Sequence, residues 1–288
     1  MAKASVAALD QHGVLAEAAI NETKRGVFED KATKNLFACE YVVNNMRYLK
    51  SVGVISEDPV TGITEIAEPV GVVAGVTPVT NPTSTVIFKS LIAIKTRNPI
   101  IFSFHPSAYE CSVMAATIMR DVAIAAGAPE NCIQWLGMRS MYATNALMNH
   151  EGVATILATG GNAMVKAAYS CGKPALGVGA GNTPAIIDES AHIKMAVNSI
   201  LLSKTFDNGV ICASEQSIIV LEQVYDEVKK ELSERGAYIL KGEEIDKVRK
   251  VILNEKGGLN ADMVGQSACK IAKMAGVNVP ETAKVLVG

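Results

Sequence analysis

The sequence predicts an α/β protein built on a doubly wound parallel sheet, and two observations support this prediction. Short apolar segments alternate with longer segments of helical periodicity from about residue 69 to residue 178. Hydrophobic residues make up 49% of the chain and aromatic residues only 5%, so small aliphatic side chains dominate. Side chains of this kind are typical of parallel strands that are buried beneath helices on both faces.

Short connections join the alternating elements. Strands are expected at residues 69–76, 100–104, 132–136, 153–158 and 174–178, and helices at 84–97, 107–126, 140–148 and 162–170. Ser84 is expected to cap the first of these helices, whereas Gly127 and Pro129 would end the second. In a doubly wound sheet, ligands bind at the carboxyl ends of the strands. The loops that follow the strands ending at 76, 104 and 158 are therefore the candidate binding loops.

The regions on either side of this core follow other patterns. Roughly the first forty residues are expected to be helical, and residues 52–62 to form turns. After residue 184 we expect a short strand ending at 187, a strand at 217–221, and helices at about 191–204, 223–235 and 243–253. We therefore expect two domains, residues 1–187 and residues 188–288. The second is expected to be incomplete at its C-terminus, because the chain stops where a strand begins.

Composition and charge exclude several classes of function. The chain carries 27 Lys and Arg against 29 Asp and Glu, so neither a nucleic-acid partner nor an anionic membrane is expected. No apolar run is long enough to span a bilayer and no signal-peptide pattern opens the chain, so we expect a cytoplasmic protein. The six cysteines stand singly and the four histidines do not cluster, so we expect neither a disulfide framework nor a metal site.

Two loops could serve a ligand, although each has a simpler interpretation. Thr159, Gly160 and Gly161 follow a buried strand and open a helix, where backbone N–H groups could bind a pyrophosphate. Glycines also suit a tight turn for conformational reasons alone, and no G-x-G-x-x-G motif follows the first strand. Asn81 stands between prolines after the first strand and could stabilise an oxyanion, or it could simply help to form the turn.

Two further segments carry unusual residues for their position. Residues 177–184 hold three glycines within five residues, which is typical of a backbone pressed against a ligand or of a plain domain crossover. Cys212 lies in a polar loop, FDNGVICASEQS, where a partly exposed thiolate could act as a nucleophile. A free surface cysteine is the simpler interpretation of that loop.

Four motifs, taken in their order along the chain, closely resemble those of the acylating aldehyde dehydrogenases: TNPTS (80–84), ATGG (158–161), GVGAGNTP (177–184) and SKTFDNGVICASEQS (203–217). The similarity runs from about Phe28 to the end of the chain and is best to the aldehyde dehydrogenase half of the bifunctional aldehyde–alcohol dehydrogenases. It implies a Rossmann-like NAD(H)-binding domain, a partial α/β catalytic domain, coenzyme A as co-substrate, and a homo-oligomer in the full-length form.

The resemblance also implies roles for individual residues. Cys212 would attack the acyl carbon, and Asn81 would form an oxyanion hole with the backbone N–H of Cys212. His105 stands where the hydrolytic relatives usually have Lys, which favours NAD over NADP. The residues expected to contact the cofactor are Thr77, Pro78, Thr80, Ser103, His105, Pro106, Thr159, Gly160, Gly161 and Gly179.

Val178 is the most informative departure from the wider family. It occupies the position at which hydrolytic aldehyde dehydrogenases have a catalytic glutamate. Without this base, water would attack an enzyme thioester slowly, and CoA would attack it faster than water. The expected reaction interconverts acetyl-CoA, or another short acyl-CoA, and NADH with an aldehyde, CoA and NAD. The alternatives are a hydrolytic semialdehyde dehydrogenase and a non-catalytic remnant that binds nucleotide or oligomerises. The remnant is considered because the chain is expected to be truncated at both ends relative to the family.

Overall fold

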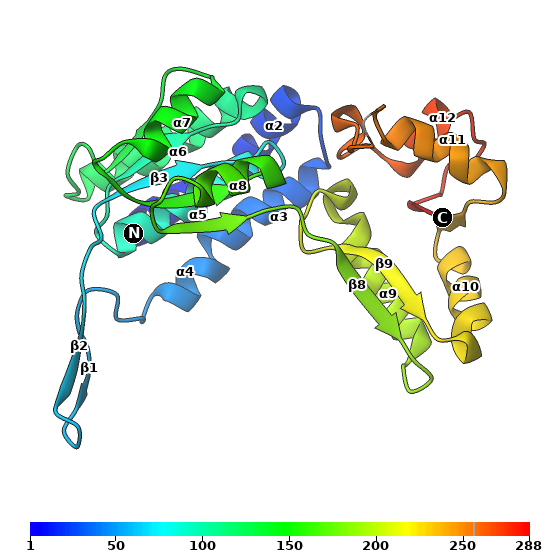
Figure 1. Cartoon of the computed structure of the whole chain (residues 1–288), viewed down its shortest axis with the longest axis horizontal. Helices are drawn as coiled ribbons and strands as arrows, with labels where there is room; N and C mark the ends of the chain where they lie inside the picture. The colour runs from blue at the N-terminus through cyan, green and yellow to red at the C-terminus, as the bar shows by residue number, and fades with distance from the viewer. Residues whose placement is uncertain (256) are drawn as a thin grey trace. The chain divides into compact units, whose positions relative to one another are not determined.

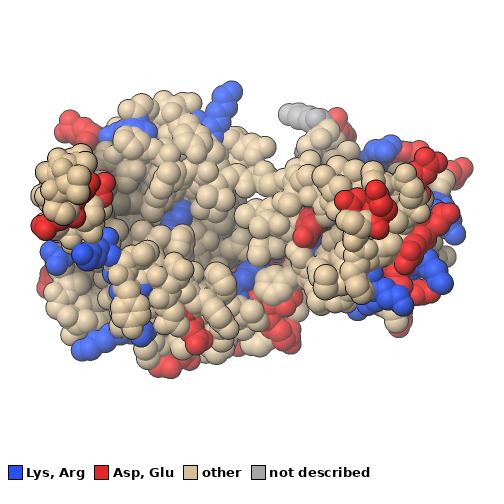
Figure 2. All heavy atoms as spheres, turned by 90° about the horizontal axis from the view of Figure 1, so that it is seen from below, with Lys and Arg blue, Asp and Glu red and all other residues tan. Residues whose placement is uncertain are grey.

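The computed structural model describes residues 1–255 and 257–288. The chain forms two compact units. Unit 1 comprises residues 1–24 and 28–180, and unit 2 comprises residues 25–27 and 181–288. On the face shown in Figure 2, acidic and basic side chains are intermingled rather than gathered by sign.

A five-stranded parallel sheet with the strand order β5-β4-β3-β6-β7 forms the centre of unit 1 (Figure 1). Its strands are β3 (Val72–Val76), β4 (Ile100–Ser103), β5 (Ile133–Trp135), β6 (Val153–Thr159) and β7 (Ala175–Val178). From β3 the chain runs outward through β4 to β5, and it then returns to the other side of β3 for β6 and β7. The predicted doubly wound sheet is confirmed, and its switch point lies between β3 and β6.

Helices bury both faces of this sheet. They are α5 (Pro82–Lys95), α6 (Tyr109–Ala125), α7 (Met141–Asn149) and α8 (Asn162–Tyr169), and the 3-10 turn Pro106–Ala108 precedes α6. One hydrophobic core joins Val73 and Phe102 of the sheet to α5 and α6, and a second joins Ala74 and Ile156 to α7 and α8. A side chain at Gly75 would lie 2.8 Å from the Phe102 ring, so glycine is needed where this ring packs across β3. Each large side chain buried in this way contributes about 1.5–3 kcal/mol.

The beginning of the chain is helical, as predicted, and it forms four helices before the sheet. They are α1 (Ala2–Asp10), α2 (His12–Thr23), α3 (Phe28–Cys39) and α4 (Tyr41–Met46). Helices α1 and α2 pack on α6, and α3 packs on α5, so this segment extends the first core. Ala4, Ala8 and Leu15 of this segment are fully buried in that core.

Two local predictions in this part of the chain are wrong. Residues 52–62, expected to be turns, contain β1 (Gly53–Asp58), which forms an antiparallel hairpin with β2 (Ile63–Ala67) and extends away from the rest of unit 1 (Figure 1). The turn is limited to residues 59–62, where the Asp58 carboxylate accepts hydrogen bonds from the N–H groups of Val60 and Thr61. Ser84 does not cap α5, because the helix already begins at Pro82, whose missing N–H suits a first turn.

Unit 2 is built on two parallel strand pairs. β8 (Thr183–Ile187) pairs with β9 (Glu215–Val220), and β10 (Ala237–Ile239) pairs with β11 (Val285–Val287). Its helices are α9 (Ile193–Thr205), α10 (Tyr225–Glu234), α11 (Glu243–Ile252) and α12 (Ala268–Met274). Ile187, Val197, Leu201, Val228 and Leu232 form the core between α9, α10 and the first pair.

The compact units divide at Gly181, whereas the sequence places the domain boundary after residue 187. The difference arises at β8, because this strand pairs with β9 of unit 2 and not with the five-stranded sheet. The assignment of cofactor binding to residues 1–187 and of catalysis to residues 188–288 stays a prediction.

Candidate active site

The carboxyl edge of the sheet in unit 1 brings several predicted residues together. Val76 of β3 pairs with Ser103 of β4 on one side and with Ala158 of β6 on the other. The backbone N–H of Thr77 donates to the carbonyl oxygen of Ser103 at 3.1 Å. Because these strands are in register, the loops that begin at Thr77, at 104 and at Thr159 start side by side at the switch point.

The Thr159-Gly160-Gly161 turn leaves an open surface at this edge. β6 ends at Thr159 and α8 begins at Asn162, with Gly161 as its N-cap at a φ of −67°. A side chain added at Gly161 would meet no atom of the described chain within 4 Å. Neither conformation nor packing requires glycine at 161, so the simple-turn interpretation does not account for it. Space in front of helix N–H groups is what a bound phosphate needs.

Thr77 and its neighbours add a second feature to this edge. Thr77 is buried, and its Oγ1 has no hydrogen-bond partner among the described residues. Buried hydroxyls without a partner are uncommon, and a ligand or a water molecule is the usual explanation. Pro78 is buried too, and the Thr80 carbonyl accepts a hydrogen bond from Lys31 at 3.1 Å. Gly179, after β7, allows the Asn162 side chain to approach, because an added Cβ would lie 3.1 Å from its Oδ1.

The stretch after β4 presents fewer side chains than expected. The Ser103 hydroxyl is buried and bonds to the Thr144 hydroxyl at 2.7 Å. His105 is half-buried and caps the 3-10 turn, its Nδ1 accepting the Ser107 N–H at 3.1 Å, while Pro106 is exposed. Of the three predicted residues, His105 and Pro106 therefore reach the surface of unit 1, and the side chain of Ser103 is engaged within the protein.

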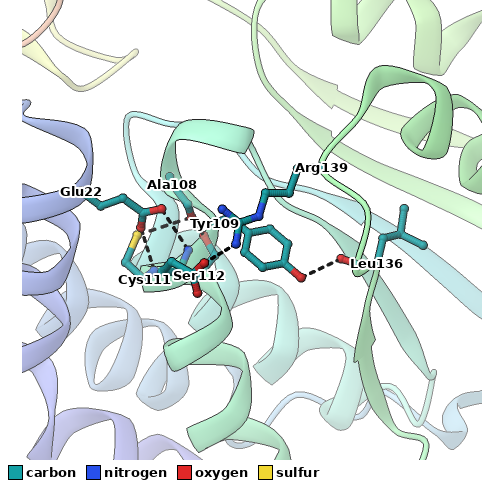
Figure 3. Close-up of polar contacts among 8 residues, drawn as sticks. Glu22, Ala108, Tyr109, Cys111, Ser112, Leu136 and Arg139 are labelled. Atoms are coloured by element: carbon teal, nitrogen blue, oxygen red, sulfur yellow. Dashed lines mark hydrogen bonds and ion pairs between the residues drawn. The ribbon is translucent and has the colours of Figure 1, made fainter.

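The start of α6 is closed by a carboxylate that the sequence analysis missed (Figure 3). Glu22 of α2 accepts the backbone N–H groups of Glu110 at 3.0 Å and Cys111 at 2.8 Å. Partial burial raises the pKa of Glu22, but the hydrogen bonds from Cys111 and Glu110 together outweigh it and hold the pKa below its usual range. This helix N-terminus is thus already occupied by an anion.

An arginine lies beside the same helix start. Arg139 lies over the Tyr109 ring, 4.0 Å from its centre, and forms an ion pair with Glu110 (Figure 3). The Tyr109 hydroxyl in turn donates to the Leu136 carbonyl at 3.1 Å. These contacts join the loop after β5 to the start of α6.

Asn81 is held by a lysine from α3. It is the N-cap residue of α5, and its Oδ1 accepts a hydrogen bond from Lys34 at 2.6 Å. Its Nδ2 donates to the hydroxyl of Thr80 at 3.3 Å, and no other partner of this nitrogen is found among the described residues. The cation fixes the oxygen of the amide, so the amide nitrogen is the group that remains to donate. Lys34 carries no motif, and the sequence analysis missed it.

Lys89 is a second lysine that the sequence analysis missed. It is 4% exposed, and its Nζ donates to the carbonyl oxygens of Val76 at 2.6 Å and Leu157 at 2.7 Å. Burial lowers the pKa of Lys89 to about 7. The amine therefore joins the carboxyl ends of β3 and β6 at the switch point. A single lysine inside the apolar run STVIFKSLIAI was the available signal.

Cys212 differs in its surroundings from the other five cysteines, all of which the structure describes. It is exposed, whereas Cys39 and Cys111 are buried and the remaining three are half-buried. Burial raises the pKa of Cys39 to about 12 and raises that of Cys111 further, so neither forms a thiolate readily. A side chain at Gly181 would collide with the Cys212 carbonyl oxygen, so glycine is required where this segment of unit 2 passes the cysteine loop.

Val178 lies at the surface of unit 1, where β7 ends. The Val178 side chain is 49% exposed at the end of β7, and its carbonyl accepts the Gly160 N–H at 3.0 Å. The described residues contain no cluster of three or more His, Cys, Asp or Glu that could hold a metal. No helix in the described ranges is long and apolar enough to cross a bilayer.

The chain is similar in sequence and structure to known aldehyde dehydrogenases. The sequence profile of the aldehyde dehydrogenase family matches residues 19–254. The chain is 63% identical to the aldehyde-alcohol dehydrogenase of Streptococcus pneumoniae serotype 4, in an alignment that covers 98% of this chain and 33% of that protein. The chain spans about a third of the length of the curated aldehyde-alcohol dehydrogenases that it matches.

Two solved structures are similar over almost the whole chain. An acetylating aldehyde dehydrogenase from Geobacillus thermoglucosidasius matches with a TM-score of 0.95 and 51% identity, over 99% of this chain and 63% of that chain. A propionaldehyde dehydrogenase from Rhodopseudomonas palustris, solved with bound CoA and an acylated cysteine, matches with a TM-score of 0.87 and 31% identity, over 99% of this chain and 66% of that chain. This chain belongs to the aldehyde dehydrogenase family.

Proposed function

We propose that the chain is a CoA-acylating aldehyde dehydrogenase that works through a thioester on Cys212. The observation that carries the proposal is the exposed thiol of Cys212 in a closely packed glycine-containing loop. The substrates would be acetyl-CoA or another short acyl-CoA, with an aldehyde and free CoA as products. The names of the relatives support this choice, because they include acetylating enzymes and a structure with bound CoA and an acylated cysteine.

Cys212 performs the group transfer. Its thiolate forms a bond to the acyl carbon, the bond from that carbon to the CoA sulfur breaks, and CoA leaves with the electron pair. NADH, when bound, would supply the hydride that reduces the resulting thioester. The thiohemiacetal oxyanion then collapses, which breaks the bond to the Cys212 sulfur, releases the aldehyde and returns the thiolate.

Asn81 stabilises the negative charge that develops on the acyl oxygen. Lys34 holds the amide oxygen of Asn81, so the amide nitrogen presents its hydrogens as donors in a fixed direction. A donor that is already oriented needs no reorganisation when the charge appears, which is the basis of oxyanion stabilisation. The backbone N–H of Cys212 is the second donor in this proposal.

The edge of the sheet in unit 1 fits a dinucleotide. The unpartnered Thr77 hydroxyl and the open turn at Gly161 are observations that a bound pyrophosphate would explain. We propose NAD rather than NADP. Glu22 occupies the N–H groups at the start of α6, so this helix offers no free anion site, and His105 adds no fixed cation.

Val178 determines whether the acyl group of the thioester passes to water or to CoA. An apolar side chain cannot take a proton from water, so hydrolysis is slow and CoA is the effective acceptor in the reverse direction. A hydrolytic semialdehyde dehydrogenase would need a carboxylate at this place.

We also propose a cytoplasmic homo-oligomer, as the resemblance implies. The exposed Ile63 and Ile66 of the β1–β2 hairpin support self-association.

One experiment separates these functions. The chain is incubated with acetyl-CoA, and protein mass and free CoA are followed. We expect one acetyl group on Cys212, released by neutral hydroxylamine, together with an equal amount of CoA, and NADH should then be oxidised with formation of acetaldehyde. A chain that takes up no acetyl group, or takes it up equally after Cys212→Ser, contradicts the proposal.

A further inference from the structure

The residues directly before Cys212 have an unusual backbone. Asp207, Asn208 and Gly209 all have positive φ angles, of 51°, 52° and 74°. This left-handed conformation is unfavourable for residues with a side chain, although Asp and Asn tolerate it better than most. Two such residues in succession, where glycine would be free of strain, call for a function of their side chains.

Both side chains reach segments that are distant in the sequence. The Asp207 carboxylate is fully buried, and its Oδ1 accepts the backbone N–H of Val27 at 2.7 Å. The Asn208 amide donates to the carbonyl oxygen of Gly265 at 3.1 Å. A buried carboxylate is retained only where hydrogen bonds compensate its lost hydration. The turn is therefore tied to two other segments of unit 2.

These two segments are joined to each other as well. The Gly26 N–H donates to the same Gly265 carbonyl at 3.0 Å. A side chain at Gly265 would lie 2.8 Å from the Gly26 nitrogen and 2.9 Å from the Val210 side chain, so the three segments are in close contact. Val210 is 3% exposed. The chain is thus fixed two residues before Cys212.

The chain is fixed again just after the cysteine. Ser214 is buried, and its N–H and its hydroxyl both donate to the Ile211 carbonyl, at 3.1 Å and 2.9 Å. Gly181 packs against the Cys212 carbonyl oxygen. The exposed thiol therefore lies between two closely packed points of the loop, and the left-handed turn sets the direction in which the chain approaches Cys212.

We infer that Asp207 and Asn208 are positioning residues, which orient the Cys212 thiol and its backbone N–H through the left-handed turn. The inference rests on the proposed role of Cys212 as the nucleophile. Acyl transfer requires a defined direction of attack, and a displacement of about 1 Å can lower such a rate on the order of a hundredfold. Alkylation by a small reagent such as iodoacetamide has much weaker orientational demands.

The test uses the 288-residue chain and two variants at one position. Asn208→Gly keeps the left-handed backbone but removes the amide donor, and Asn208→Asp keeps the shape but cannot donate to Gly265. Arg97→Gly is the matched control, because Arg97 is also left-handed, at a φ of 55°, but lies in unit 1 between α5 and β4. Asp207→Asn is the conservative variant, since it keeps an oxygen to accept the Val27 N–H.

Three readouts are compared: acetyl transfer from acetyl-CoA to Cys212, alkylation of Cys212 by iodoacetamide, and amide hydrogen exchange of residues 209–216. Both Asn208 variants should exchange faster in this peptide and lose about tenfold or more in acetyl transfer. Their alkylation rates should change less than about threefold and their melting temperatures should stay close to that of Arg97→Gly. Asp207→Asn should retain most of the transfer rate.

The outcomes distinguish this inference from the proposed function. An unmodified chain that accepts no acetyl group at Cys212 would overturn the proposed function, while the hydrogen exchange would still decide whether the turn orders the loop. Unchanged exchange in both Asn208 variants would overturn the positioning role whatever the transfer rates. Faster exchange with unchanged acetyl transfer would overturn it too, because the order of the loop would then be irrelevant to the reaction.

Discussion

Unit 1 and unit 2 hold their candidate residues by different means. In unit 1, parallel strands in register place Thr77, Ser103 and Thr159 at one edge, so the backbone of the sheet determines their positions. In unit 2, Cys212 lies in a loop between α9 and β9 that is fixed by side chains such as Asp207 and Asn208. Backbone pairing therefore sets the positions of the proposed cofactor residues, whereas side-chain contacts set the position of the proposed nucleophile.

The largest effect is expected at the nucleophile itself. Cys212→Ala should abolish acetyl transfer from acetyl-CoA, because burial keeps Cys39 and Cys111 in the thiol form. Cys171→Ala, which changes a half-buried thiol in unit 1, should retain full transfer. Mass spectrometry of the acylated chain measures both variants. Transfer that survives in Cys212→Ala would place the nucleophile elsewhere.

The oxyanion donor should give the next largest effect. Removing one such donor raises the barrier by about 2.7–4 kcal/mol, so Asn81→Ala should lower turnover on the order of a hundredfold or more. Lys34→Met should have a smaller effect, because the amide would remain but lose its fixed orientation. Turnover and NADH affinity are measured together. If the turnover of Asn81→Ala lies within about twofold of that of the unmodified protein, Asn81 serves only to form the turn and is not an oxyanion donor.

Substitutions at two glycines of unit 1 should distinguish an effect on cofactor binding from an effect on core packing. Gly161→Ala adds a methyl group to open space, so it should weaken NADH binding about tenfold without changing stability. Gly75→Ala would force a methyl group to 2.8 Å from the Phe102 ring, so it should lower the free energy of unfolding by about 1–3 kcal/mol. Fluorescence titration and chemical denaturation measure the two quantities. An equal loss of stability in both variants would mean that Gly161 serves packing alone.

Lys89 should make the stability of the chain depend on pH. Its folded pKa of about 7 lies below the ordinary value of 10.5, so between these pH values the unfolded chain binds a proton that the folded chain does not. Stability should therefore rise with pH across this window by up to about 1.4 kcal/mol per pH unit, and Lys89 should make no pH-dependent contribution below pH 7. Lys89→Met should remove this rise, whereas Lys95→Met on the same helix should keep it. The free energy of unfolding is measured by denaturation at several pH values. If it rises with pH as steeply in Lys89→Met as in the unmodified chain, the assignment to Lys89 is contradicted.

The smallest effect is expected at position 178. Val178 is 49% exposed, so Val178→Glu should fold normally. The new carboxylate should accelerate hydrolysis of the acetylated enzyme only modestly, because a general base also needs correct reach and a suitable pKa. Release of acetate from the acetylated variant measures this effect, with Val178→Gln as the uncharged control. Equal rates in the two variants would show that a carboxylate at this place cannot reach the thioester.

The strands of the sheet were predictable because short aliphatic runs, such as the one ending at Val76, are bounded by turn residues and alternate with longer segments of helical periodicity. The β1–β2 hairpin was missed because most of its residues are exposed on both faces, which leaves no alternation of apolar and polar side chains. Motif residues such as Asn81 and Cys212 could be found through their neighbours in the sequence.

The residues that support the site could not be found in this way. Glu22 contacts Glu110 across 88 positions of the chain, and Lys89 contacts Leu157 across 68. Such contacts depend on how helices pack on the sheet, and neither periodicity nor local spacing records that packing. The bond between the Ser103 and Thr144 hydroxyls could likewise be seen only in the tertiary structure.

The fate of an acetyl group on Cys212 tests the central claim most directly. The chain is acetylated with acetyl-CoA, separated from free CoA, and then divided between buffer and buffer with added CoA. We predict slow release of acetate in buffer alone and rapid return of the acetyl group to CoA when CoA is present, because Val178 provides no base for water. Acetate released equally fast in both samples would contradict the acylating function and would favour a hydrolytic aldehyde dehydrogenase.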